Sequence, residues 1–316
     1  MNESIDAISL NFEPGSLVAL NVILGLIMFG IALSLRVSDF RDVAKRPRAP
    51  LIGLTAQFLL LPAATWVLTR LLDLPPSISL GMILVSSCPG GNISNFIAHL
   101  SHANTALSVS VTAVSTAMAV VMTPLNVSFW GSMSPDTRAV LTDFSIDPFD
   151  MFLNVLILLG VPLIAGMSVR AKWPELADRA QKPFKVLSIL LFVALVVVAF
   201  QSNFQAFIAV IGVIFIPVAL HNALAWAVGY SAASAAQLPK EDVRAVAIEV
   251  AIQNSGLGLV LIFAFFEGLG GMAVIAGWWG IWHIIAGLTV AAFWSRSSDG
   301  LDGADGSDGS DGSDSG

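Results

Sequence analysis

The chain has 316 residues, of which 56% are hydrophobic and only 12% charged, and its mean hydropathy is +0.81. A soluble domain usually carries about a quarter charged residues, so this composition excludes an ordinary soluble protein and indicates a polytopic membrane protein. The net charge of −7 gives no clue to a partner, because six of the acidic residues lie in the last eighteen positions. No basic patch suggests nucleic acid, and the single cysteine, Cys88, excludes an intrachain disulfide framework.

The two ends of the chain differ from the apolar body. Residues 1–16 are acidic and carry no positive segment ahead of the first apolar run, which argues against a cleaved signal peptide and favours an extracytoplasmic N-terminus. Residues 297–316 have an Asp at nearly every third position, and this composition is typical of a disordered acidic tail. We expect the tail to lie in the cytoplasm.

Apolar runs long enough to cross a bilayer recur along the body of the chain. A membrane-spanning helix needs about 20 residues. Two of the runs are interrupted by polar or helix-breaking residues, at CPGGN (88–92) and at QNSGLG (253–258). Counting each interrupted run as one crossing predicts an all-α membrane protein with nine transmembrane helices. The nine runs are 17–36, 51–72, 76–101, 104–130, 151–170, 186–202, 205–231, 243–267 and 271–295.

The positions of Lys and Arg predict the orientation of these spans. With the N-terminus outside and the C-terminus inside, thirteen of the fifteen basic residues lie in cytoplasmic segments, and only Arg70 and Arg138 lie outside. This distribution satisfies the positive-inside rule. We therefore expect a multi-pass protein of a bacterial inner membrane with this orientation.

The two interrupted runs occupy corresponding places in two halves of the chain. Residues 17–130 and 186–295 each contain four spans, the third of which is interrupted, and 151–170 is left over. The two halves cross the membrane in opposite senses, so we interpret 17–295 as a transporter domain with inverted repeats. Gly- or Pro-interrupted spans at corresponding places in such halves are a sequence pointer to a transporter binding site.

One charged residue, Glu249, sits well inside a predicted span. A carboxyl group at that depth costs roughly 2.5–3.5 kcal/mol on insertion scales, so it is normally paired, protonated or bound to a cation. No Lys or Arg lies deep within a span to pair with it, and Gln253 follows one turn later on the same face. Two interpretations remain, a protonated structural Glu and a cation ligand.

Neutral oxygen groups near the breaks favour a cation ligand. Asn92, Ser94 and Asn95 surround the first break, and Ser108 and Thr112 share one face of the next span. Hydroxyl and amide oxygens with one carboxylate suit an alkali cation, whereas zinc and copper prefer nitrogen and sulfur ligands. The positive N-terminal ends of the half-helices at the breaks suit an organic anion.

Six stretches of the sequence carry a family resemblance, namely CPGGNISN, IEVAIQNSGLGLVL, GLIMFGIALSLRVSDF, AQFLLLPAATW, ALSVSVTAVSTAMAVVMTPL and ALHNALAW. With these motifs, the chain resembles the bile acid:sodium symporter family over nearly its whole length. The resemblance implies a core domain with two crossed, broken helices and a panel domain of other spans. It also implies two sodium sites that share Glu249. The first would use Ser94, Asn95, Ser108, Thr112 and Glu249, and the second Gln57, Glu249, Gln253 and backbone oxygens near Val250 and Ile252.

Departures from the family pattern concern the substrate. The chain lacks the extra N-terminal helix of ten-span bacterial members and is similar to the nine-span branch. Asn92 stands where many members have Thr, and Ile284 stands where similar bacterial members have Asn after the His. The substrate-binding residues that we expect are Asn92, Asn254, His283 and Ile284.

These features predict a sodium-coupled symporter, not an enzyme, that takes up a small organic anion with two sodium ions per substrate. The expected partners are the anion and membrane lipid, and the sequence carries no signal for an oligomeric state. The alternatives are a proton-coupled or uncoupled carrier of organic anions and a binding protein of the same fold that does not transport. A bile acid, another small carboxylate and a sulfonate all remain open as the substrate.

Overall fold

The computed structural model describes residues 14–91, 93–144, 148–202 and 204–302. Within these ranges every named element is a helix and no strand is found. The helices are α2 (Pro14–Ala32), α3 (Val37–Lys45), α4 (Arg48–Thr55), η1 (Ala56–Leu60), α5 (Leu61–Leu71), α6 (Pro76–Ser87), α7 (Ile93–Leu100), α8 (Thr105–Ser132), α9 (Pro135–Asp143), α10 (Pro148–Val155), η2 (Leu156–Gly160), α11 (Val161–Lys172), α12 (Pro174–Ser202), α13 (Phe204–Ala235), α14 (Lys240–Ala251), α15 (Ser255–Phe265) and α16 (Gly270–Asp302).

The helices have the length and composition of a membrane protein. In the described part of the chain, four are long and apolar enough to cross a bilayer, namely Arg48–Leu71, Thr105–Ser132, Ile214–Ala235 and Gly270–Arg296. Pro76–Ser87 and Ser255–Phe265 are shorter apolar helices. Large apolar side chains such as Leu59, Phe129 and Phe293 are exposed on the surface, as expected where lipid replaces water. The fold is an all-α membrane fold, and the count of nine spans stays a prediction.

Both interrupted runs are broken helices. The first break lies between Ser87 and Ile93, as the CPGGN motif predicted. The second is shorter than predicted, because α14 ends at Ala251 and α15 already begins at Ser255. The side chain of Asn254 accepts a hydrogen bond from Leu257 N (3.0 Å) and caps α15, which lets the helix restart before Gly256 and Gly258.

Other boundaries also differ from the prediction. Residues 135–143, expected in an outer loop, form α9, which begins with Pro135 in the first turn. Helix α16 continues to Asp302, so residues 297–302 are helical rather than part of a tail. Each further residue adds one backbone hydrogen bond to an existing helix, and no proline intervenes to stop it. Residues 1–13 and 303–316 lie outside the described chain.

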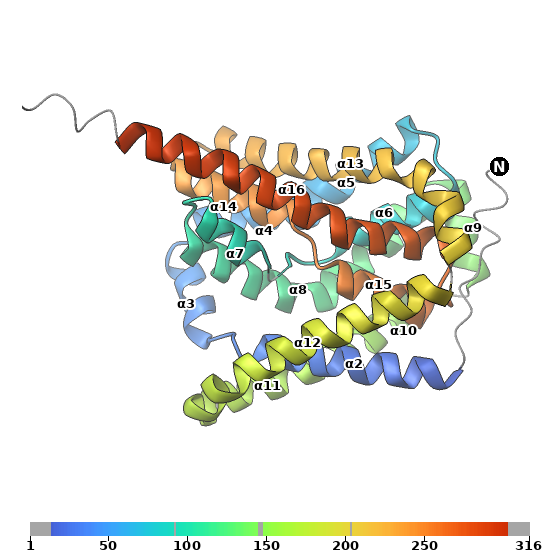
Figure 1. The fold of residues 1–316 in the computed structure, drawn as a ribbon, viewed down its shortest axis with the longest axis horizontal. Helices are drawn as coiled ribbons and strands as arrows, with labels where there is room; N and C mark the ends of the chain where they lie inside the picture. The colour runs from blue at the N-terminus through green and yellow to red at the C-terminus, as the bar shows by residue number, and fades with distance from the viewer. Residues whose placement is uncertain (1–13, 92, 145–147, 203, 303–316) are drawn as a thin grey trace, which may run out of the picture.

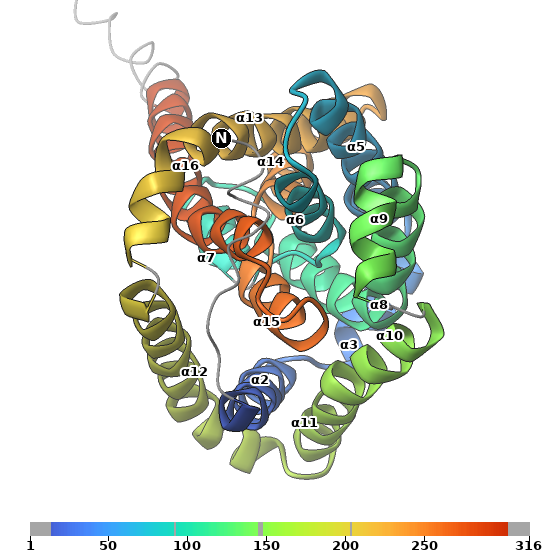
Figure 2. The same cartoon turned by 90° about the vertical axis from the view of Figure 1, so that its right-hand side faces the viewer.

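Helices α2, α11 and α12 pack together along one side of the molecule, and the broken helices lie among the others (Figures 1 and 2). Arg170 at the end of α11 holds this group together. Its buried guanidinium donates to Leu33 O (2.6 Å) and pairs with Asp178 on α12. The hydrogen bond that Arg170 donates to the Asp178 carboxylate lowers the pKa of Asp178.

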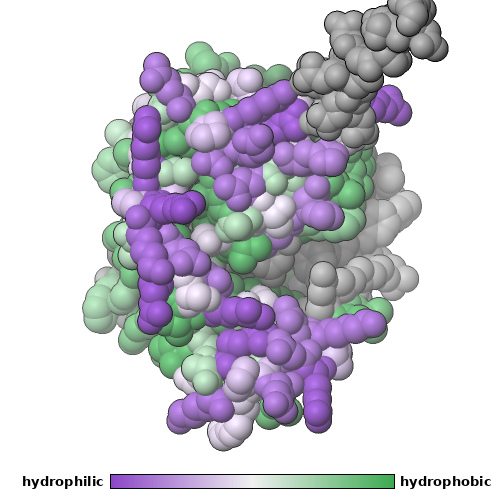
Figure 3. Space-filling model, turned by 90° about the vertical axis from the view of Figure 1, so that its left-hand side faces the viewer, coloured by the Kyte–Doolittle hydropathy of each residue, from purple (hydrophilic) through white to green (hydrophobic). Residues whose placement is uncertain are grey.

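Hydrophilic side chains gather at one end of the molecule (Figure 3). This end carries α3, the connection between α11 and α12, and the connection between α13 and α14 (Figure 1). Exposed cationic side chains from all three segments lie there, including Arg41, Lys172 and Lys240. The segments assigned to the cytoplasm by charge thus meet at one end.

A matched set of turns brackets the two broken helices. Four non-glycine residues of the described chain have positive φ, namely Asp73 (49°), His102 (49°), Gln237 (53°) and Glu267 (50°). Asp73 and Gln237 come just before α6 and α14, and both of these helices have twelve residues. His102 and Glu267 come just after α7 and α15. Positive φ is uncommon outside glycine, so its recurrence at equivalent places is the pattern that two repeats would produce.

Helix α13 approaches α14 so closely that Gly229 has no room for a side chain. A Cβ on Gly229 would lie 2.8 Å from Ala247 Cα and 3.0 Å from Val250 Cβ. We expect Gly229→Ala to destabilise the protein by about 1–3 kcal/mol, because backbone atoms must move. Thermal unfolding of the purified protein in detergent measures this.

Gly212→Ala on the same helix is the control. A Cβ at Gly212 would meet nothing within 4 Å among the described atoms. Alanine favours a helix by about 1 kcal/mol over glycine, so this variant should be unchanged or more stable. Equal melting temperatures for the two variants would contradict the close approach of α13 to α14.

Candidate functional site

The two broken helices meet at their breaks, where the chain segments run antiparallel. Gly90 and Gln253 form an antiparallel bridge. The Gly91 N–H donates to Ile252 O (2.7 Å), and the Asn254 N–H donates to Pro89 O (2.9 Å). Backbone groups released by each break are therefore satisfied in part by the other break, as burial inside the protein requires.

The residue types at the first break explain its shape. Pro89 cannot donate a backbone hydrogen bond and disfavours helical geometry at Cys88, which is extended (φ −75°, ψ 159°) and ends α6. The glycines that follow allow close approach. A Cβ on Gly90 would lie 2.5 Å from Glu249 Oε2, and one on Gly91 would lie 2.9 Å from Gln253 O. Only glycine leaves these oxygens where they are.

The first oxygen cluster surrounds the carboxyl group of Glu249, which is 2% exposed. Ser94 Oγ and Ser108 Oγ each lie 2.5 Å from Glu249 Oε1, and Thr112 Oγ1 lies 2.8 Å from Oε2. Asn95 Oδ1 lies 2.9 Å from Ser108 Oγ and 3.3 Å from Thr112 Oγ1. All five residues predicted for the first sodium site are therefore brought together from α7, α8 and α14.

This cluster holds more acceptor oxygens than its hydroxyl hydrogens can serve. Thr112 Oγ1 lies within hydrogen-bonding distance of Glu249 Oε2, Asn95 Oδ1 and Ser108 O, yet it carries a single hydrogen. Ser108 Oγ likewise faces two acceptors. A buried group of converging oxygens with one carboxylate and too few hydrogens is suited to a small hard cation.

A second cluster joins the two glutamines. Gln57 Nε2 donates to Gln253 Oε1 (2.9 Å), and Gln253 Nε2 lies 3.1 Å from Gln57 Oε1. Gln57 also donates to Cys88 O (2.7 Å), and Gln253 donates to Val250 O (2.6 Å). Ile252 O accepts from Gly91 N, so both backbone oxygens predicted for the second site already carry a donor.

The place of Gln57 depends on a feature that the sequence did not reveal. Gln57 lies in η1, a π-helical segment within the helix that runs from α4 to α5. Pro62 cannot donate to Phe58 O four residues earlier, and Asn126 Nδ2 on α8 fills that acceptor at 2.9 Å. Single π turns inside helices occur frequently at functional sites.

Asn222 is a further polar residue at the crossing that the sequence analysis did not single out. It is 1% exposed, and its Nδ2 donates to Ala251 O (2.9 Å) at the end of α14. The neighbouring His221 Nε2 lies 2.8 Å from Thr65 Oγ1, and its ring packs 4.6 Å from that of Trp279. The motif ALHNALAW was visible in the sequence, but only the fold shows which carbonyl Asn222 holds.

The residues predicted to bind substrate are not gathered in this way. Asn92 lies outside the described residues. Asn254 is at the second break, where its side chain caps α15. His283, which is 5% exposed, and Ile284 lie on α16, and no described contact joins them to either oxygen cluster.

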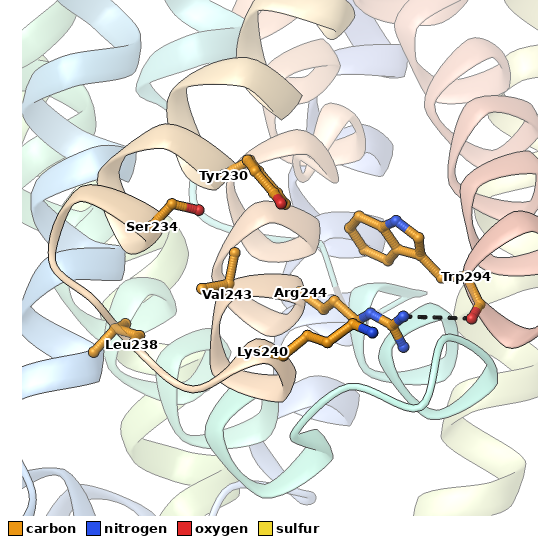
Figure 4. A pocket seen from close by; sticks show the side chains of 7 residues that line it. All are labelled: Tyr230, Ser234, Leu238, Lys240, Val243, Arg244 and Trp294. Carbon is orange, nitrogen blue, oxygen red and sulfur yellow. Dashed lines mark hydrogen bonds between the residues drawn. The ribbon is translucent and has the colours of Figure 1, made fainter. Parts of the chain in front are cut away.

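Two cavities lie away from the crossing. One, of about 370 Å³, sits at the opposite end of α14 and is lined by Tyr230, Ser234, Leu238, Lys240, Val243, Arg244 and Trp294 (Figure 4). There Arg244 donates to Ser101 O (2.9 Å) and to Trp294 O (3.5 Å), which ties α14 to the end of α7 and to α16. The other, of about 490 Å³, includes His99 and His102. The described chain has no group of three or more His, Cys, Asp or Glu that could hold a metal ion.

Comparison with known proteins identifies the family. Residues 21–210 match the model of the Sodium Bile acid symporter family. The chain is 33% identical over 277 residues to the "Uncharacterized sodium-dependent transporter YocS" of Bacillus subtilis (strain 168), which covers 88% of this chain and 83% of that protein. It is 31% identical over 243 residues to the human ileal sodium/bile acid cotransporter, covering 75% of this chain and 67% of the relative.

A plant relative is also similar. The probable chloroplastic sodium/metabolite cotransporter BASS2 of Oryza sativa subsp. japonica is 32% identical over 239 residues, covering 75% of this chain and 55% of the relative. The family model covers more than half of the chain, and the bacterial alignment continues through most of the remainder. The protein therefore belongs to the sodium bile acid symporter family, whose members are sodium-dependent transporters rather than enzymes.

Proposed function

We propose that the protein is a symporter that takes up an organic anion together with two sodium ions by alternating access. The observation that carries this proposal is the buried Glu249 carboxylate, enclosed by hydroxyl and amide oxygens where two broken helices cross. A carboxylate at this depth is costly unless a cation balances it. The oxygen ligands are those that an alkali cation prefers.

The first sodium site comprises Glu249 and the four residues around it, Ser94, Asn95, Ser108 and Thr112. Sodium would replace the short oxygen–oxygen contacts of Glu249 with cation–oxygen contacts. The second site comprises Glu249, Gln57 and Gln253 with the backbone oxygens of Val250 and Ile252. There the amide oxygens of Gln57 and Gln253 now face each other's NH₂ groups, and a rotation of either amide would turn its oxygen to an ion.

The anion is proposed to bind beside the same crossing. Helices α7 and α15 both begin there, and the N-terminal end of a helix carries a partial positive charge that favours an anion. Asn92, Asn254, His283 and Ile284 would form its surroundings. Names of relatives include a bile acid and a metabolite as cargo, so a small carboxylate or sulfonate is the substrate class that we propose.

Transport is proposed to follow from movement of two groups of helices. The repeats 17–130 and 186–295 would form nine spans with the helix 151–170, with the N-terminus outside and the cationic end in the cytoplasm. The matched turns around the broken helices support this arrangement, as does the hydrophilic end of the molecule with its exposed cationic residues. The group α2, α11 and α12 would act as the panel and the remaining spans as the core.

The main alternative to a sodium symporter is a proton-coupled carrier, and the residues of the site allow the two to be distinguished by experiment. Such a carrier needs Glu249 as a titrating group but does not need four neutral oxygen-bearing side chains around it. A protein that binds without transporting would keep sodium binding and lose uptake. These outcomes separate the three functions.

Glu249→Gln should abolish sodium-dependent stabilisation and uptake. Gln has nearly the same shape but carries no negative charge to balance the cation. Sodium stabilises only a protein that binds it, so the shift in melting temperature with sodium concentration reports binding directly. Glu267→Gln, at an exposed turn, is the matched control and should respond as the native protein does. A normal sodium response in Glu249→Gln would refute the assignment.

Gly90→Ala should displace the Glu249 carboxylate, since the new Cβ would lie 2.5 Å from Oε2. We expect loss of most sodium-dependent stabilisation in a variant that still reaches the membrane. The control is Gly258→Ala near the second break, where the new Cβ would lie an ordinary 3.6 Å from Cys88 Sγ. If both variants bind sodium like the native protein, sodium binding does not depend on the close contact between Gly90 and Glu249.

Uptake of a monovalent anion should increase with an inside-negative membrane potential. Two sodium ions and one monoanion move one net positive charge, which is worth about 2.3 kcal/mol per 100 mV. Proteoliposomes at fixed sodium, with potentials set by potassium and valinomycin, measure this. Uptake that ignores the potential would exclude the two-sodium stoichiometry, and Gln57→Ala should then have little effect.

A further inference from the structure

We infer that Asn222 is a positioning residue for the cation ligands of α14, an inference that rests on the proposed function. Asn222 lies on α13 and is fully enclosed by the protein. Its side-chain NH₂ group holds the carbonyl oxygen of Ala251, the last residue of α14. Ala251 stands two residues after Glu249 and two before Gln253, so this carbonyl lies between the two side chains that bind the ions.

Asn222 has a counterpart in the other half of the chain. Gln57 lies on the second long helix of the first half and donates to Cys88 O at the end of α6, 31 residues further on. Asn222 lies on the second long helix of the second half and donates to Ala251 O at the end of α14, 29 residues further on. The Gly90–Gln253 bridge lies two residues beyond each of these carbonyls.

The Gln57–Cys88 and Asn222–Ala251 contacts therefore occupy equivalent positions at the two breaks. Each broken helix ends with a carbonyl that the missing next turn leaves without a backbone donor, and in each half an amide side chain supplies one. The side chain of Gln57 is longer than that of Asn222 by one methylene group. The longer Gln57 also reaches Gln253 Oε1, whereas the only described hydrogen bond of the Asn222 side chain is to the Ala251 carbonyl.

Three consecutive carbonyls at the end of α14 are fixed by three different partners. Val250 O accepts from the Gln253 side chain, Ala251 O from Asn222, and Ile252 O from the Gly91 backbone. Two of these three partners belong to the proposed second sodium site or to the first break. Asn222 is the one that can be removed without touching a proposed ligand.

Loss of Asn222 would leave a buried carbonyl unsatisfied. An unsatisfied buried acceptor is costly, so the end of α14 would turn to find another donor. That movement would carry Glu249 and Gln253 with it and misplace ligands of both sites. The effect should appear in sodium affinity rather than in stability alone, which distinguishes positioning from ordinary packing.

The experiment compares sodium titrations of thermal stability for the purified native protein, Asn222→Ala, Asn222→Ser and Thr65→Val. Serine at this position is too short to reach Ala251, and it provides a second variant if Ala does not fold. Thr65→Val is the matched control, because it removes an equally buried hydrogen bond to the adjacent His221 and leaves the Ala251 carbonyl held. Choline replaces sodium to keep the ionic strength constant.

We expect both Asn222 variants to raise the half-saturating sodium concentration by about tenfold, the factor that corresponds to one misplaced interaction of roughly 1.4 kcal/mol. Thr65→Val should lower the melting temperature without sodium and leave the half-saturating concentration unchanged. Equal half-saturating concentrations for the Asn222 variants and the native protein would overturn the inference. Absence of any sodium response in the native protein would instead overturn the proposed function.

Discussion

The structure depends on one constraint: a helix interrupted in the interior of a membrane protein must find hydrogen-bond partners for its backbone inside the protein. Two helices are interrupted here, and each supplies the partners for the other through Gly91, Ile252, Asn254 and Pro89. This exchange fixes where the helices cross and requires glycine at the point of contact. It also brings α7, α8 and α14 together at the place where their oxygen-bearing side chains meet.

The chemistry of the crossing follows from the same exchange. A helix end has free carbonyls and a helix start has free N–H groups, so two breaks side by side present both kinds of group in one buried place. Glu249 adds the single full charge. The surrounding hydroxyl groups and amides can reorient without moving the backbone, which suits the ion site that we propose.

The sequence predicts those parts of the candidate site that depend on local physics. It does not predict those that depend on contacts made by the fold. Glu249 stood out because a lone charge in an apolar run is costly, and the prolines and glycines of CPGGN marked the first break. Gln57 was named only through family resemblance, since it lies in a π segment that the periodicity of the sequence does not indicate. The second break proved shorter because the cap provided by Asn254 is decided by local geometry. Nothing in the sequence singled out Asn222, because its partner, Ala251, is on another helix.

The exchange of hydrogen bonds between the breaks also has a consequence for synthesis. Residues 88–91 leave the ribosome long before residues 252–254, yet the backbone groups of each segment are satisfied by the other. The first broken helix therefore cannot complete its pairing when it enters the bilayer. Until the second half arrives, that segment must be shielded by water, by lipid head groups or by the insertion machinery. The contact between the breaks thus leaves the newly inserted first half incomplete, and the fold is finished only after the second half has entered the membrane.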